Sequence, residues 1–153
     1  MARIVDLALE ASEVFRSYSA VHEELLGASI RRWAFIAGLS KPIDFPGLEK
    51  RLMYLESKLA DIRTELAGLS EQELTKRAKD DLHIELDRYA LALARAMDKL
   101  RVICRRMDEA EKTDAGRAAY TTEQLNRDKV AYDYAVQEYK RHGMRLNRLL
   151  SNY

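Results

Sequence analysis

Apolar residues recur along most of this chain at alternating spacings of three and four. The first such series is Ile4, Leu7, Ala11, Val14, Tyr18, Val21, Leu25 and Ala28. An α-helix has about 3.6 residues per turn, so residues at these spacings form one apolar stripe, which we call the seam of the helix. A seam must be buried against other helices. The spacing therefore predicts a helical fold.

Three more segments repeat this pattern. The second seam is Leu48, Leu52, Leu55, Leu59, Ile62, Leu66 and Leu69. The third is Leu82, Leu86, Tyr89, Leu93, Ala96, Leu100, Ile103, Met107 and Ala110. The fourth is Leu125, Asp128, Tyr132, Ala135, Tyr139, His142, Leu146, Leu149 and Tyr153, which is more aromatic and more polar than the others. Four seams predict four helices.

Helix breakers and capping residues indicate where these helices begin and end. Pro42 has no backbone donor and ends the first helix, and Gly68 is a suitable stop for the second. Ser70 and Thr121 each stand three residues before Glu or Gln, the spacing of a capping box. Residues 111–120 lose the period and are expected to form a loop. The expected helices span residues 2–39, 46–68, 70–112 and 121–151.

Short connections between successive helices favour antiparallel neighbours. We therefore expect an all-α fold: one elongated, coiled-coil-like, up-down-up-down four-helix bundle domain over residues 1–153. The first and third helices would reach about 55–65 Å and the second only about 33 Å. The unmatched ends would expose apolar stripes, unless a bend near Gly27 shortens the first helix or another chain covers them. A homodimer or a helical protein partner is the expected remedy.

Composition narrows the possible functions. Hydrophobic residues make up 47% and charged residues 33% of the chain, which excludes a disordered protein. The formal net charge is +1, so no global field attracts the chain to nucleic acid or to an anionic membrane. No segment has the roughly 20 apolar residues that cross a bilayer, and the N-terminus lacks a signal-peptide pattern. We expect a cytoplasmic protein without membrane insertion.

A search for catalytic motifs finds no phosphate-binding glycine loop, zinc-spaced cysteine pair or nucleophile elbow. Asp80 with His83, and Glu138 with His142, share helix faces and are the best candidates for a metal-bundle enzyme. The chain has no Glu-x-x-His motif, however, and dimetal bundles use two. We therefore predict no catalytic residues, no cofactor and no metal.

Two single residues allow both a functional and a structural interpretation. Cys104 precedes Arg105 and Arg106, whose charge would lower a thiol pKa, but no second cysteine exists. A structural thiol is the favoured interpretation. His142 in the fourth seam is either a pH switch or, as we favour, an ordinary histidine with one satisfied hydrogen bond.

Two surfaces are candidate partner sites. Residues 33–39 are apolar around the whole helix, so Arg32, Trp33, Phe35 and Ile36 are either buried by neighbouring segments, which we favour, or form a partner interface. Lys140, Arg141, Arg145 and Arg148 make the C-terminal helix basic. This basic segment is either a candidate nucleic-acid contact or, as we favour, a set of cations stabilised by the helix dipole.

These observations predict a non-enzymatic helical-bundle module for protein–protein interaction or assembly, such as an adaptor, chaperone-like or structural subunit. The alternative is an accessory subunit of a nucleoprotein complex that contacts nucleic acid through the basic C-terminal helix.

Overall fold

The computed structural model describes residues 3–27, 43–69 and 77–151, with side chains described from residue 81 onward in the last range. Its helices are α1 (Arg3–His22), α3 (Phe45–Ala67), α4 (Arg77–Lys112), α5 (Asp114–Ala119) and α6 (Thr122–Leu150), and α1 continues into a π-helical turn, η1 (Glu23–Gly27). The described residues contain no strand. The predicted all-α fold is confirmed.

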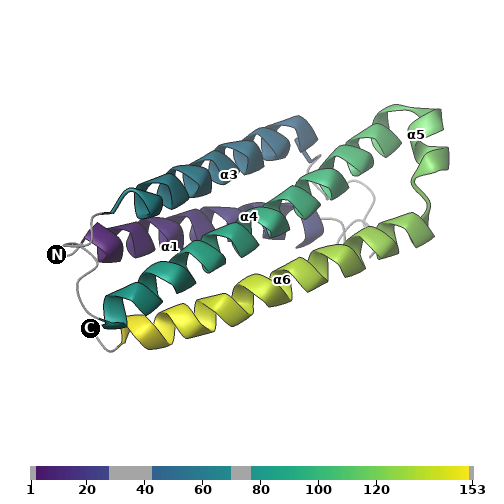
Figure 1. Ribbon diagram of the computed structural model, residues 1–153. Coiled ribbons are helices and arrows are strands. Elements are labelled where there is room, and N and C mark those ends of the chain that lie inside the picture. The colour runs from purple at the N-terminus through teal and green to yellow at the C-terminus, as the bar shows by residue number, and fades with distance from the viewer. Residues whose placement is uncertain (1–2, 28–42, 70–76, 152–153) are drawn as a thin grey trace.

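The four long helices run up, down, up and down, as Figure 1 shows. α4 packs against α3 on one side and against α6 on the other, while α1 packs mainly against α3. This arrangement confirms the predicted elongated antiparallel bundle. Within the part of the chain that the structure describes, no helix is long and apolar enough to cross a membrane.

The predicted seams form the core of the bundle. From Ile4 to Leu25 and from Leu48 to Leu66, every described seam residue is buried. In α4 the seam is buried from Leu82 to Ile103. In α6 the seam is buried only at Tyr132, Tyr139 and Leu146. α6 therefore has the least completely buried seam, in agreement with its more polar sequence.

Capping side chains mark the starts of α3 and α6. The Asp44 carboxylate accepts a hydrogen bond from the Gly47 amide at 3.1 Å, so α3 begins at Phe45, one residue before the expected start. The Thr121 hydroxyl accepts from the Gln124 amide at 3.2 Å, at the predicted capping position before α6. Each cap satisfies a backbone donor that has no partner within its helix.

The first helix changes geometry near the residue where a bend was expected. Residues Glu23–Gly27 form a π-helical turn that ends at Gly27. The expected end of this helix at residue 39 and the expected start of the third helix at residue 70 both lie outside the described residues. So do the candidate interface residues Arg32, Trp33, Phe35 and Ile36.

The loop prediction for residues 111–120 is wrong in part, because residues Asp114–Ala119 form the short helix α5. The Thr113 hydroxyl caps this helix by accepting from the Gly116 amide at 2.8 Å. A Cβ at position 116 would lie 2.3 Å from the carbonyl oxygen of Glu109, so only glycine allows this tight turn after α4. Hydrophobic spacing could not predict this helix, because it has only six residues and none of their side chains is buried.

The expectation that unmatched helix ends expose apolar stripes is also wrong at this end of the bundle. Figure 1 shows that α5 and the adjoining ends of α4 and α6 extend beyond the start of α3. Between residues 100 and 125, however, no large hydrophobic side chain is exposed. Met107 and Leu125 pack against the core instead, and the surface of this end carries charged residues such as Asp108 and Lys112.

Candidate interaction grooves

Exposed apolar surface gathers at the opposite end of the bundle, between α1 and α6. A groove of about 720 Å³ runs between these two helices. Its α1 wall includes Val5, Leu9 and Phe15, and its α6 wall includes Met144 and Leu150. The first turn of α1 and the last turn of α6 lie at this end of the bundle (Figure 1). Most of the residues that line the groove are apolar, as in helix-binding grooves.

Two tyrosine rings also line this groove. Tyr89 of α4 and Tyr139 of α6 contribute to its lining. Gly143 has no side chain, and a Cβ there would lie 3.2 Å from the Tyr89 ring. This glycine therefore lets the tyrosine ring of α4 reach the lining of the groove beside α6.

The two walls of the groove expose large hydrophobic side chains to solvent. Leu9 is 55% exposed and Met144 is 66% exposed. Lys140 is the only charged residue among the described residues that line the groove. Adjacent apolar side chains on both walls form a surface that gains free energy when another molecule covers it.

Sequence reasoning missed this groove, although a signal for it was present. Val5 and Phe15 each follow a seam residue of α1, and Leu9 lies four residues after Val5, so together they widen the apolar face of α1 beyond the seam. On α6, Gly143 and Met144 lie between the seam residues His142 and Leu146. A second apolar stripe beside the seam indicates a helix that buries more than one face.

A hydrogen-bonded cluster joins α1 to α6 further along the bundle. The Tyr132 hydroxyl lies 2.6 Å from Nδ1 of His22 and also contacts the Tyr18 hydroxyl. The rings of Tyr18 and Tyr139 meet edge to face with their centroids 5.9 Å apart. Burial raises the pKa of Tyr18 and of Tyr132 and lowers the pKa of His22, so all these groups favour their neutral forms.

His142 and Glu85 form a second polar contact inside the bundle. Nδ1 of His142 lies 2.5 Å from Oε1 of Glu85, and Nε2 lies 3.8 Å from the Glu138 carboxylate. Glu85 is 6% exposed and is the only buried charged residue in the described part of the chain. The predicted satisfied histidine is present, and its partner comes from the neighbouring helix α4.

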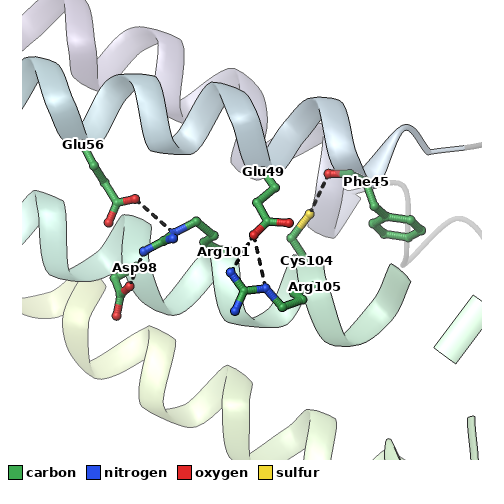
Figure 2. A network of polar contacts seen from close by, with 7 residues as sticks. All are labelled: Phe45, Glu49, Glu56, Asp98, Arg101, Cys104 and Arg105. Carbon is green, nitrogen blue, oxygen red and sulfur yellow. Dashed lines mark hydrogen bonds and ion pairs between the residues drawn. The ribbon is translucent and has the colours of Figure 1, made fainter. Parts of the chain in front are cut away.

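The thiol of Cys104 is buried between α4 and the start of α3. Figure 2 shows its Sγ atom pointing to the backbone carbonyl of Phe45, to which it donates at 3.3 Å. Burial, followed by the charges of Glu49 and Asp108, raises the pKa of Cys104 to about 12. The lowered thiol pKa considered from the sequence is therefore wrong, because the thiol is buried and the two arginines pair with the carboxylates of Glu49 and Asp128.

Ion pairs cover the edge of the interface between α3 and α4. Figure 2 shows Arg105 reaching Glu49 of α3, with 2.7 Å between Nη2 and Oε1. Arg101 pairs with Glu56 of α3 at 3.1 Å and with Asp98 of its own helix at 2.8 Å. These contacts use the α3–α4 edge for structure.

The candidate metal pairs do not form a metal centre in the described residues. Nε2 of His83 lies 2.7 Å from the carbonyl oxygen of Leu66, so this histidine donates to the last turn of α3. The Asp80 side chain lies outside the described residues. No group of three or more metal-ligating side chains is present among those that the structure describes.

The four basic residues of the C-terminal helix do not share one surface. Lys140 lines the apolar groove, whereas Arg145 and Arg148 line a groove on the α4 side of α6. Arg141 pairs with Glu138 at 2.6 Å.

The comparisons with family models, with curated proteins and with solved structures found no match.

Proposed function

We propose that this chain is a non-enzymatic helical-bundle module for protein–protein interaction and assembly. The observation that carries this proposal is the apolar groove between α1 and α6, with Leu9 and Met144 exposed on its walls. The groove accommodates the apolar face of a helix, a recognition mode that uses side chains at helical spacing.

A second copy of the chain is the occupant that we propose for this groove, which makes the module a homodimer. The chain has a net charge of +1, so two copies repel each other little. Lys140 is the only charge among the described lining residues, so charge provides little selection for a different partner. Twofold pairing would place the exposed apolar side chains of each copy against those of the other.

Other parts of the proposal come from the sequence alone. A cytoplasmic location is consistent with a single cysteine whose thiol is buried in this structure. The residues Arg32, Trp33, Phe35 and Ile36 stay a predicted contribution to the interface. The absence of a recognisable catalytic motif in the sequence supports an interaction role.

Nucleic-acid binding through the basic C-terminal helix is the weaker alternative. Lys140, Arg141 and Arg145 point to different surroundings rather than to one phosphate-binding surface. A salt-dependent mobility shift with the full chain would support this alternative.

Sedimentation of two matched variants tests the proposed assembly. Leu9→Lys places a charge on the groove wall, and Val130→Lys places the same charge on α6 at a residue that is also 55% exposed. We expect wild type and Val130→Lys to form dimers and Leu9→Lys to stay monomeric. A folded wild-type chain that is monomeric at high concentration would contradict the proposed homodimer. Equal dimerisation of Leu9→Lys would contradict the use of the groove.

A further inference from the structure

The side of α6 opposite the apolar groove carries a different kind of surface. A groove of about 740 Å³ lies between the outer edges of α4 and α6. A second groove of about 420 Å³ lies beside it, towards the C-terminal end of α6. Arg88 lines both, so the two grooves form one continuous surface. We call this surface the cationic face.

The cationic face is lined by Arg88, Arg95 and Lys99 of α4 and by Arg145 and Arg148 of α6. The three residues of α4 are spaced by seven and four, which places them on one side of that helix. Arg95, Lys99, Arg145 and Arg148 are exposed and form no ion pair with any described residue. Arg88 has only a distant contact, 3.9 Å from Glu85. These cations are therefore free to pair with a ligand.

Most carboxylates of the same face already have other partners. Asp98 pairs with Arg101 at 2.8 Å, Glu138 with Arg141 at 2.6 Å, and Glu85 with His142 at 2.5 Å. Asp81 is the one lining carboxylate for which no ion pair within the described residues is present. The unbalanced charge of this face is therefore positive, although the chain as a whole is nearly neutral.

Apolar residues, most of them alanines, line the groove between these cations, together with Tyr134. They are Leu91, Ala92 and Ala94 of α4 and Ala131 and Ala135 of α6. Helices pack with their axes about 8–10 Å apart, and small side chains allow the closest approach. A helix that lies over these alanines would place its flanking residues beside the arginines and the lysine.

We propose that the cationic face binds an amphipathic helix of another protein, in which an apolar stripe is flanked by Asp or Glu residues. Apolar burial in the alanine-lined groove and charge pairing with Arg95 and Lys99 would act together. A polynucleotide fits less well, because Leu91, Ala92 and Ala135 make the groove between the cations apolar, and such a lining offers no partner to a sugar–phosphate backbone.

A second copy of the chain also fits this face poorly. The acidic groove of the chain lies between α1 and α3, but most of its carboxylates are already paired. Arg3 pairs with both Glu10 and Glu65, and Arg16 pairs with Glu13. The acidic helix is therefore expected from a different protein. This inference uses none of the residues tested for dimerisation, so its failure would leave the proposed function unaffected.

A designed peptide provides the test. The probe is a fluorescein-labelled helical peptide with Leu at heptad positions a and d and Glu at e and g, measured by fluorescence anisotropy with the full chain at low salt. A control peptide carries Lys in place of each Glu. We expect the Glu peptide to bind, the Lys peptide not to bind, and added salt to weaken the complex.

Two double variants with the same change in charge locate the site. Arg95→Glu with Lys99→Glu alters the cationic face, whereas Lys50→Glu with Lys58→Glu alters exposed residues of α3. The first pair should weaken binding about tenfold or more, and the second should leave it unchanged. Circular dichroism checks that both remain helical. Equal affinity in both variants would overturn the proposal. Binding of single-stranded oligonucleotide but not of the Glu peptide would also overturn it.

Discussion

The imidazole of His142 lies 2.5 Å from the buried carboxylate of Glu85, so a polar contact links α6 to α4 inside the bundle. The side chains of Glu85 and His142 are 8% and 15% exposed. A carboxylate with so little access to water depends on its partner for stabilisation. We expect this contact, together with apolar packing, to help fix the register of α4 against α6.

Removal of one partner of this pair should destabilise the bundle. We expect His142→Leu to lower the free energy of unfolding by roughly 2–4 kcal/mol, because Glu85 would stay buried without a partner. The double variant Glu85→Leu with His142→Leu should recover much of that loss, since it leaves no buried charge. Urea denaturation measures both effects. A single variant as stable as wild type would show that the pair contributes little.

Stability should fall as the solution becomes acidic, in part because of His22. Burial lowers the pKa of His22 below its usual value of 6.5, although the charges of Glu23 and Asp133 act in the opposite direction. Between the folded-state pKa and pH 6.5, the unfolded chain therefore binds a proton at His22 more readily than the folded chain does. Stability contributed by neutral His22 is present above about pH 6.5 and is lost as the pH falls through the folded-state pKa.

The variant His22→Gln separates this contribution from that of other groups. Glutamine cannot take up the proton, yet it can still form a hydrogen bond with Tyr132. Free energies of unfolding are measured from about pH 7 to about pH 5. We expect the loss on acidification to be smaller in the variant than in wild type. An identical pH dependence would show that His22 is not the group responsible.

The thiol of Cys104 should be unreactive while the protein is folded. Its pKa is raised to about 12, so almost none is thiolate near neutral pH, and the sulfur is buried. A disulfide reagent should modify it only after denaturation. The variant Met53→Cys adds a thiol at a residue that is 51% exposed and should react at once. Fast modification of folded wild type would contradict the structural role.

Hydrophobic spacing predicted the bundle well because each seam has a single physical reason to face inward. The seam from Leu48 to Leu66 is buried throughout, because the apolar stripes of the four long helices all face one shared core. The short helix α5 could not be predicted in this way, because it buries no side chain and depends on Thr113 and Gly116. Local capping chemistry, rather than apolar period, defines that segment.

The grooves were less predictable because they depend on which helices lie side by side. Spacing shows that Arg95 and Lys99 share a side of α4, but not that this side borders Arg145 of α6. Sequence alone joined Lys140 to Arg145 in one basic segment, and the structure separates them onto opposite sides of α6. Surfaces formed by two helices need the relative placement of both.

Methyl signals of methionine test the proposed assembly most directly. Met144 and Met53 are both exposed, at 66% and 51%, but only Met144 lines the apolar groove. With methyl-labelled methionine and a dilution series of the wild-type chain, we expect the Met144 signal to shift or broaden with concentration while the Met53 signal stays constant. A Met144 signal that is unchanged across the series, or one that changes only together with Met53, would contradict self-assembly through this groove.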